Sequence, residues 1–598
     1  MRRLSPLVWA TGLLLLTTLV AYRHVGQLGF VNLDDDAYVE FAPMVNQGVR
    51  RAALVWAVTS IHTANWHPLT SISHMIDCEI FGVNPGPMHW ENLGWHLLNS
   101  TLVLLVWNRL TRNVWSSAMV AALFALHPLH VESVAWISSR KDLLCTLFWL
   151  LGIAAYLRWA ERRTLGRYLF VALCLATALL FKPMAVTFPA TLLLLDAWPL
   201  GRRAKKDWWS LFREKIPLFA VVLLHSVITY AVQHGAGAAN YAARIPLGAR
   251  LGNAAVAYAR YLGKTFWPDS FSPLYWHPGY WPVWFVGGSL LLLGLVSFVA
   301  WRQRAARPWL SFGWLWFLGT LVPVIGIIQV GAQSMADRYT YVPLLGIFTI
   351  VACGGAELVE RLPRLRRPLA TAAVAVLAAC LFFTQRQVLT WQNSVQLYQR
   401  SIAGGEDNPA IRYLLAMAYA AAGRPEDDVV AELKKVTARQ PDYVNANTQL
   451  AMIAMRHQRF DEVQAILEQN VRYEPRNESL LVNLGSFWSL RGDVERGLRY
   501  YQEALRLNPT AAGIHRELAQ GYLKLNRVDD ALTHYQAAIR ADAWTAMDWA
   551  NAGLILGNKG QLAESRRYFE RTLWIEPGNE FALRNLRAID EIERSQRR

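Results

Sequence analysis

Long apolar segments alternate with short polar connections over the first two-thirds of the chain. Eleven of them approach the roughly 20 residues that a helix needs to cross the hydrocarbon core of a bilayer. The segments are 4–22, 89–108, 114–131, 141–159, 167–182, 184–200, 216–233, 281–301, 309–330, 341–359 and 369–384. The pattern predicts a polytopic helical membrane domain with about eleven spans.

The pattern changes near residue 409 to a period of 34 residues, which is the length of a tetratricopeptide helix–turn–helix unit. The recurring positions are prolines (Pro441, Pro475, Pro509, Pro577), small residues (Ala451, Gly485, Ala519, Gly553) and turn residues (Gly423, Gly492, Asn526, Gly560). About five repeats of this kind stack into a superhelix with a concave groove. We therefore expect an all-α protein with a membrane domain over 1–388 and a tetratricopeptide superhelix over 389–598.

The net charge of +16 belongs almost entirely to the first domain, because residues 401–598 contain 26 Lys and Arg against 27 Asp and Glu. Hydrophobic residues make up 54% of the chain and charged ones only 17%. The excess charge lies in short clusters between apolar segments, which is typical of membrane topology and argues against nucleic-acid binding. The clusters are Arg2/Arg3, Arg109/Arg112, Arg158/Arg162/Arg163/Arg167, Arg202/Arg203/Lys205/Lys206, Arg302/Arg304/Arg307 and Arg361/Arg364/Arg366/Arg367.

One topology puts all six clusters on the cytoplasmic side, as the positive-inside rule favours: a cytoplasmic N-terminus followed by eleven alternating spans. The loops 23–88, 132–140, 234–280 and 331–340 and the repeats then face the other compartment, which is the periplasm in a bacterium or the ER lumen in a eukaryote. Segment 250–267 could be a twelfth span or an interfacial helix. A crossing there would move the last basic clusters to the wrong side, so we expect it to lie on the membrane.

Three adjacent carboxylates, Asp34, Asp35 and Asp36, follow the first apolar segment. A solvated helix cap is the simplest interpretation, because Asp side chains accept hydrogen bonds from unpaired amides at a helix start. A cap requires one such residue, however, and three lie here between apolar neighbours. We therefore favour a functional role.

Further polar residues are expected on the same side as the aspartates. His67 lies in a short polar element, and the third apolar segment ends in His127, His130 and Glu132, followed by Arg140 and Lys141. Two more cations, Lys182 and Arg338, lie in turns expected on that face. Snorkelling and interhelical ion pairs could explain some of them. Neither explanation accounts for why these cations lie on the side of the membrane where the positive-inside rule expects few.

This arrangement suits transfer of a sugar from a lipid phosphate. Departure of the phosphate creates anionic charge, which fixed Arg and Lys side chains stabilise without a general acid. The remaining task is to take a proton from the acceptor hydroxyl, which one carboxylate can do. One acid and a cationic clamp at the membrane surface are thus a minimal glycosyl-transfer site.

Three strings carry a resemblance to a known family. They are Phe30–Asp36, then His127–Ala135 with Ser139–Asp142, and then Asp337–Pro343, followed by the repeats. Together they resemble the transmembrane and tetratricopeptide-repeat-containing O-mannosyltransferases and their bacterial relatives, which have the GT-C architecture. The His-Pro-Leu-His segment at 127–130 is the most specific part.

The resemblance implies an inverting transferase that moves a mannose-like sugar from a polyprenyl-phosphate donor to a hydroxyl of an acceptor protein held in the repeat groove. It places the catalytic base at Asp35, with Asp34 and Asp36 as alternates because the triplet leaves the register open. Arg140, Lys141, Lys182 and Arg338 would bind the donor phosphate, with His67, His127, His130 and Glu132 in support. No cofactor, metal or nucleic acid is expected.

Two other functions compete with this one. A non-catalytic membrane-anchored scaffold would use the repeats to recruit periplasmic proteins, but an anchor needs neither the aspartates nor the Arg140/Lys141 pair. A flippase or polymerase component for lipid-linked sugars would carry its charges deep within the spans. The charges here cluster at one mouth, so the transferase is favoured.

Overall fold

The computed structural model describes residues 5–61, 65–235, 245–329 and 331–597, and the chain forms two compact units, 1–423 and 424–598. The Arg2/Arg3 cluster and part of loop 234–280 lie outside the described residues. The predicted domain boundary at 388 falls at the end of helix α18, whereas the first compact unit continues through two more helices.

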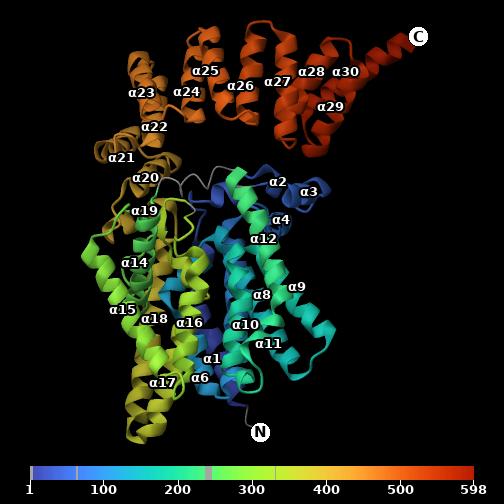
Figure 1. Ribbon diagram of the computed structural model, residues 1–598. Helices are drawn as coiled ribbons and strands as arrows, with labels where there is room; N and C mark the ends of the chain where they lie inside the picture. Colours follow the sequence, from blue (N-terminus) through green and yellow to red (C-terminus); the bar gives the residue numbers. More distant parts are fainter. Residues whose placement is uncertain (1–4, 62–64, 236–244, 330, 598) are drawn as a thin grey trace. The chain divides into compact units, whose positions relative to one another are not determined.

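The first unit is a bundle of helices with one small antiparallel sheet (Figure 1). The sheet pairs β1 (Tyr275–Trp276) with β2 (Gln333–Met335). The helices are α1 (Pro6–Ala21), α2 (Pro43–Asn46), α3 (Arg51–Thr59), α4 (Pro68–Phe81), α5 (Pro85–Thr111), α6 (Val114–Leu126), α7 (Val131–Ala135), α8 (Arg140–Glu161), α9 (Leu165–Phe181), α10 (Phe188–Ala197), α11 (Trp208–Arg213), α12 (Ile216–Gly235), α14 (Leu247–Phe266), α15 (Val283–Arg302), α16 (Pro308–Leu321), α17 (Leu344–Arg361), α18 (Arg366–Thr390), α19 (Ser394–Ala403) and α20 (Pro409–Ala421).

Local sequence explains where the helices near the candidate site begin and end. Asn113 separates α5 from α6, and its side chain accepts hydrogen bonds from Trp115 N and Ser116 N, which are unpaired amides of the new helix. Pro128 then ends α6, because proline cannot donate the next backbone hydrogen bond. The chain continues as the 3₁₀ turn η3 (Pro128–His130), α7 and the 3₁₀ turn η4 (Ile137–Ser139), which leads into α8.

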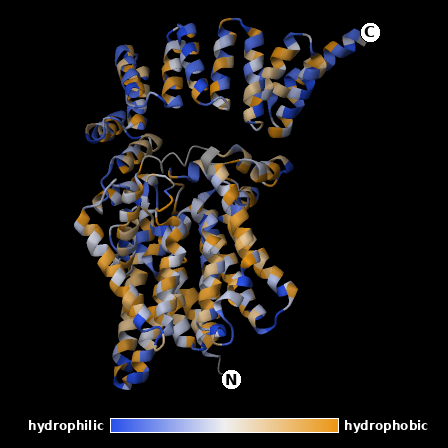
Figure 2. Ribbon diagram, viewed as in Figure 1, coloured by the Kyte–Doolittle hydropathy of each residue, from blue (hydrophilic) through white to orange (hydrophobic). Residues whose placement is uncertain are grey.

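The structure supports fewer membrane spans than the eleven expected. Four helical stretches among the described residues are long and apolar enough to cross a bilayer, or five if the pair Val114–Leu126 and Pro128–Ala135, bent by 53°, counts as one. The four are Pro6–Gln27, Ile137–Glu161, Val283–Arg302 and Pro363–Thr390. Ile137–Glu161 is largely buried, whereas many apolar side chains of the other three are exposed, such as Val283 (87%), Leu291 (75%) and Val374 (68%). They form a largely hydrophobic surface suited to lipid (Figure 2).

Four of the other predicted spans are short, interrupted or lined with buried polar side chains. α9 has only 17 residues and α10 only 10, because the turn η5 (Pro183–Thr187) interrupts the apolar run. The predicted span 309–330 stops at Leu321, and α5 buries Asn92, His96 and Asn99 along its length. Apolar composition alone therefore did not predict where turns interrupt an apolar segment.

The second unit is an array of helix hairpins, which confirms the predicted tetratricopeptide repeats. Its helices are α21 (Glu426–Arg439), α22 (Val444–Arg456), α23 (Phe460–Tyr473), α24 (Glu478–Leu490), α25 (Val494–Leu507), α26 (Ala512–Lys524), α27 (Val528–Ala541), α28 (Ala546–Asn558), α29 (Leu562–Ile575) and α30 (Glu580–Arg597). Gly492, Asn526 and Gly560 take positive φ angles at the predicted turns. The predicted small residue Gly485 allows close packing, since a Cβ there would lie 2.7 Å from the Tyr501 ring.

Candidate active site

The three aspartates of the first loop have different surroundings, although they are adjacent in the chain. Asp34 keeps a 39% exposed side chain, and its Oδ2 lies 3.9 Å from the Nζ of Lys141. Asp36 begins the π-helical turn η2 (Asp36–Glu40), and its Oδ1 accepts a hydrogen bond from Ala37 N at 2.9 Å. Asp35 is fully buried. Of the three, Asp34 thus combines solvent access with a neighbouring cation that was predicted to bind the donor.

Asp35 joins the first loop to the turn before α8. Its Oδ1 accepts hydrogen bonds from Ser138 N at 2.9 Å and Ser138 Oγ at 2.6 Å, and its Oδ2 accepts one from Val31 N at 3.2 Å. Burial raises the pKa of Asp35 to about 7, although these hydrogen bonds act in the opposite direction. An enclosed carboxylate of this kind can hold the loop in place. The geometry favours this positioning role for Asp35, while its predicted role as base stays a prediction.

Replacing Asp35 with Asn should change how the stability of the protein depends on pH. The pKa of about 7 in the folded chain lies above that of a free aspartate, which is about 4, so the folded state binds the proton more tightly. The stabilising contribution is therefore complete below about pH 4 and is lost as the pH rises to about 7. From the size of the pKa difference, we expect the free energy of unfolding of the wild type to fall by up to roughly 4 kcal/mol over this pH range, relative to that of Asp35→Asn. Unfolding curves recorded at several pH values measure it.

The matched control is Asp36→Asn, which alters a half-buried neighbour in the same loop. It should keep the pH dependence of the wild type. Equal pH dependence in the wild type and Asp35→Asn would show that the buried carboxyl does not titrate in this range.

Three of the four predicted donor-binding cations lie in one row, which we call the cation row: Lys141, Arg338 and Lys182. Aromatic rings separate them. The Nζ of Lys141 and the Cζ of Arg338 lie 5.5 Å and 5.0 Å from the ring centre of Trp136. Arg338 and Lys182 in turn share Tyr339, at 5.0 Å and 5.5 Å. Segments almost 200 residues apart in the sequence thus place three positive charges side by side.

Each cation of the row has a carboxylate partner. The pairs are Lys141 with Asp34, Lys182 with Asp142, and Arg338 with Glu132. Glu132 also accepts a hydrogen bond from Arg338 N at 3.1 Å, which fixes the turn η8 (Asp337–Thr340) against α7. The side chains of the three cations are only 10–14% exposed. Charges with so little water around them interact strongly with one another and with any anion that reaches them.

Arg140, the fourth predicted cation, points elsewhere. It is fully buried, and its guanidinium forms an ion pair with Asp77 and lies 3.2 Å from Glu91. Its Nε donates to Asn92 Oδ1 at 2.9 Å, and its Nη2 donates to the carbonyl of Met88 at 3.1 Å. The guanidinium thus joins α8 to α4 and α5. Its donors are directed at protein groups, which is the geometry of a structural residue.

The two histidines of the His-Pro-Leu-His segment hold the local backbone. His127 Nδ1 accepts a hydrogen bond from Leu129 N at 3.2 Å, so its Nε2 donates to the carbonyl of Thr265 at 2.9 Å. His130 lies 2.7 Å from the carbonyl of Phe124 through Nδ1. Both side chains are buried. They stabilise the break between α6 and α7, which places Glu132.

His67 lies close to the cation row. Burial lowers its pKa well below the ordinary value, and the charges of Lys141 and Lys182 lower it further. The imidazole is therefore neutral at neutral pH. Among the described residues, no group of three or more His, Cys, Asp or Glu side chains is placed to hold a metal ion. The predicted absence of a metal stays a prediction.

A cavity of about 260 Å³ has Glu132, the partner of Arg338, in its wall. Its wall residues come from α7, the 268–273 loop, η8, the end of α18 and α19. They are Pro128, Glu132, Pro268, Asp269, Ser270, Phe271, Ser272, Pro273, Asp337, Phe383, Arg386, Gln387, Thr390, Trp391, Leu397, Arg400 and Gly404. Asp337 is held there by the hydroxyl of Tyr275, which donates to its Oδ2 at 2.7 Å.

Sequence reasoning missed the aromatic side chains that organise the row. Tyr339 lies inside the third string of the family resemblance, and Trp136 lies between the two parts of the second, but neither was predicted to have a role. A tryptophan or tyrosine close in sequence to two or more unexplained cations is a usable signal, because cations are attracted to the faces of these rings. Asp77 was also missed as a partner of Arg140, since no spacing rule connects residues 63 positions apart.

Known proteins resemble parts of the chain. The tetratricopeptide repeat family model matches residues 448–512, 491–544 and 516–579. Protein O-mannosyl-transferase TMTC2 of Mus musculus is 29% identical over 160 residues, which cover 25% of this chain and 19% of that protein. Protein O-mannosyl-transferase Tmtc1 of Drosophila melanogaster is 32% identical over 139 residues, which cover 23% and 16%.

Part of this chain is thus similar to the TMTC protein O-mannosyl-transferases. The resemblance expected from the motifs is thereby confirmed, and the matched part spans about a fifth of the length of these relatives. Among solved structures, a crystal structure of MamA is 21% identical and covers 27% of this chain and 95% of that protein, with a TM-score of 0.24. The four long apolar helices among the described residues are those of a membrane protein.

Proposed function

We propose that the protein is a GT-C-type glycosyltransferase that moves a mannose-like sugar from a polyprenyl-phosphate donor to a hydroxyl of an acceptor protein, with inversion. One observation carries the proposal: an accessible carboxylate, Asp34, lies beside a row of three clustered cations in a relative of the protein O-mannosyl-transferases. A scaffold has no use for such a site.

The cation row would receive the donor phosphate. When the bond between the sugar C1 and the phosphate oxygen breaks, its electron pair stays on that oxygen. Arg338, Lys141 and Lys182 would stabilise the new charge through charge-assisted hydrogen bonds in surroundings that exclude most water. Their present carboxylate partners keep the row close to neutral until the phosphate arrives.

Asp34 would act as the general base. As the acceptor oxygen forms its bond to C1, its proton passes to the Asp34 carboxylate, and attack opposite the departing phosphate inverts the configuration. Asp34 suits this role because its side chain is accessible, whereas both oxygens of Asp35 accept hydrogen bonds from the protein. Lys141 would hold the Asp34 carboxylate toward the row. Asp35 would hold the loop.

The acceptor would enter beside Arg338. The wall of the cavity there includes Glu132, the partner of Arg338. The repeats would present the acceptor protein, since tetratricopeptide arrays use their surfaces to bind other chains.

We place this site on the periplasmic or lumenal side of the membrane. Lys141 lies at the start of α8, and Glu161 ends it. At 1.5 Å per residue, 22 residues of helix extend about 33 Å, close to the roughly 30 Å core of a bilayer. Glu161 pairs with Arg109, and Arg163 pairs with Glu214, so basic clusters gather at the far end of α8. The positive-inside rule then favours that end for the cytoplasm.

The direct test is transfer of label from radioactive polyprenyl-phosphate mannose to Ser/Thr-containing peptides by the purified full chain in liposomes. Single substitutions Lys141→Gln, Lys182→Gln and Arg338→Gln should each raise the donor KM about 10- to 100-fold, which corresponds to the loss of one charge-assisted contact. Arg109→Gln, at the other end of the bundle, is the matched control and should behave as wild type. Absence of label transfer with every donor and acceptor tried would refute the proposal.

A further inference from the structure

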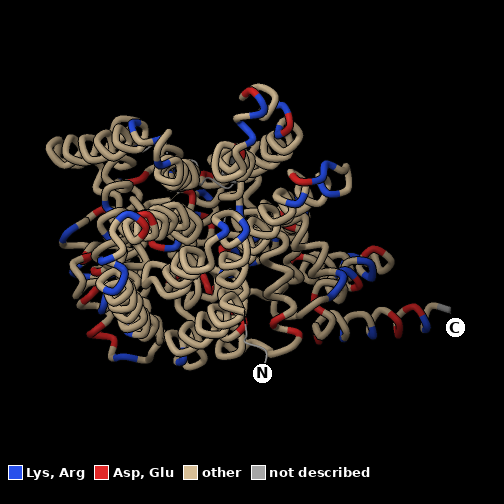
Figure 3. The backbone as a smooth tube through the Cα atoms, turned by 90° about the horizontal axis from the view of Figure 1, so that it is seen from below, with Lys and Arg blue, Asp and Glu red and all other residues tan. Residues whose placement is uncertain are grey.

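A second charged cluster lies at the end of α8 opposite the candidate active site. Residues 201–215 contain six Lys and Arg against two Asp and Glu, and they connect α10 to α12. Viewed from below, Lys and Arg gather at helix connections, whereas the helices themselves are mostly uncharged (Figure 3). None of these residues has a role in the proposed transfer.

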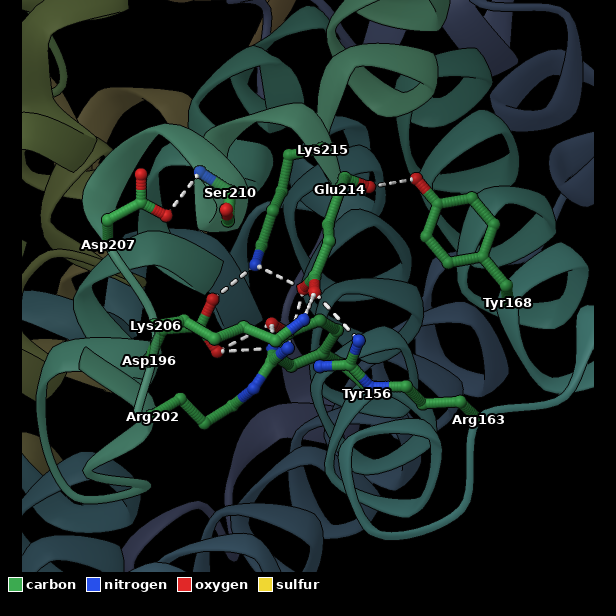
Figure 4. Close-up of polar contacts among 10 residues, drawn as sticks. All are labelled: Tyr156, Arg163, Tyr168, Asp196, Arg202, Lys206, Asp207, Ser210, Glu214 and Lys215. Atoms are coloured by element: carbon green, nitrogen blue, oxygen red, sulfur yellow. Dashed lines mark hydrogen bonds and ion pairs between the residues drawn. The ribbon is translucent and has the colours of Figure 1, made fainter. Parts of the chain in front are cut away.

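Part of this cluster forms a closed ion-pair network (Figure 4). Asp196 is fully buried and accepts hydrogen bonds from Tyr156 Oη at 2.6 Å and Arg202 Nη1 at 2.8 Å, and it forms an ion pair with Lys215. Removing either partner of such a buried pair is costly, so the network is a rigid structural element. It fixes the 201–215 connection to α8 through Tyr156.

Glu214 extends the network to the neighbouring helix. Its carboxylate pairs with Lys206 at 2.7 Å and with Arg163 at 2.9 Å. Its backbone carbonyl accepts a hydrogen bond from Tyr168 Oη at 2.6 Å, which joins the connection to α9. The two carboxylates therefore account for four of the basic residues nearby: Arg163, Arg202, Lys206 and Lys215.

Three basic residues of the same connection stay outside the network. Arg203, Lys205 and Arg213 are exposed, and the structure gives them no ion pair within the part of the chain that it describes. The guanidinium of Arg203 lies 5.0 Å from the ring centre of Trp208. A connection that is held rigidly by buried pairs thus presents three exposed cations at its surface, of which Arg213 has the exposed Asp207 in its neighbourhood.

Aromatic side chains are exposed beside these cations. The short helix α11 carries all three: Trp208 is 44% exposed, Trp209 61% and Phe212 37%. Water is a poor environment for a surface of this kind. Trp residues next to Lys and Arg are characteristic of segments that lie at the level of lipid headgroups.

We propose that residues 203–213 form a binding surface for anionic phospholipid headgroups, with Arg203, Lys205 and Arg213 contacting the phosphates and Trp208, Trp209 and Phe212 entering the headgroup layer. Free inorganic phosphate fits less well, because it has no apolar part to cover the aromatic rings. The bound lipid would anchor the end of α8 opposite the cation row. This proposal does not depend on the transferase activity.

The test is a titration of the full chain in detergent with phosphatidylglycerol that carries a fluorescent acyl chain, followed by anisotropy. Each basic residue near an anionic membrane contributes about five-fold in affinity, so the variant Arg203→Gln/Lys205→Gln/Arg213→Gln should raise the Kd roughly 100-fold. Trp209→Ser should also weaken binding without changing the charge. Added salt should weaken binding by the wild type much more than binding by the triple variant.

A matched control is Lys434→Gln/Arg472→Gln/Arg476→Gln, which removes three exposed charges from the repeats and should bind as wild type. Because the substituted residues are exposed, all variants should keep the melting temperature of the wild type without lipid. Three results would each overturn the proposal: an unchanged Kd in the basic triple variant, equal competition by phosphatidylcholine, or full displacement of the lipid by millimolar inorganic phosphate.

Discussion

Asp34→Asn should lower kcat about 100- to 10,000-fold, the range by which a general base accelerates proton transfer. Asn keeps the size of the side chain but cannot take the proton from the acceptor hydroxyl. The donor KM should change little, because the phosphate is held by the cation row. Asp34 has an accessible side chain 3.9 Å from Lys141, so the substitution should leave the melting temperature nearly unchanged. The measurement is steady-state transfer from polyprenyl-phosphate mannose, with donor and acceptor varied separately.

Asp36→Asn is the matched control for this loss. It removes a neighbouring carboxylate whose Oδ1 accepts a hydrogen bond from the backbone N of Ala37. It should keep kcat within a few-fold of the wild type. Asp35→Asn separates the two roles further: a base at position 35 predicts a loss of kcat with normal loop structure, whereas a positioning residue predicts altered stability and a rise in both KM values. Near-normal turnover of Asp34→Asn would move the base to another carboxylate, with Glu132 and Asp142 next.

Arg140→Met should destabilise the protein by about 3–5 kcal/mol, the usual cost of breaking a buried ion pair from one side. Arg140 is fully buried, and its removal leaves Asp77, which is 1% exposed, without its cation. The hydrogen bonds to Asn92 and to the carbonyl of Met88 are lost as well. Thermal unfolding of the purified protein in detergent measures the effect.

The double variant Asp77→Asn/Arg140→Met tests the cause. It removes both charges of the pair, so it should recover a large part of the stability lost in Arg140→Met, and a double-mutant cycle gives the coupling between the two side chains. If Arg140→Met instead melts like the wild type and weakens donor binding, the guanidinium contacts the donor phosphate, as the sequence had suggested.

The contrast between Arg140 and Lys141 illustrates how burial divides adjacent cations. Both precede the first apolar turn of α8, and their sequence positions gave them the same predicted role. Successive residues of a helix point about 100° apart, so one faces α4 and α5 while the other faces the first loop. Only the second direction leads to Asp34, Trp136 and the cation row.

The sequence by itself determined the features that depend on short-range periodicity. The 34-residue repeat, its turn residues Gly492, Asn526 and Gly560, and its closely packed Gly485 follow from local rules, because each repeat contacts mainly its neighbours. The motif strings were likewise enough to identify the relatives. The sequence did not determine the number of membrane spans, because the length of an apolar segment does not show whether its helix faces lipid or another helix.

Only the tertiary structure decided which of the charged residues meet. Lys141, Lys182 and Arg338 come from three separate segments, and their arrangement around Trp136 and Tyr339 depends on how α8, η5 and η8 pack. The same packing buries Asp35 under Ser138 and leaves Asp34 accessible. Charge interactions and burial depend on distance in space, which sequence spacing does not encode for residues far apart in the chain.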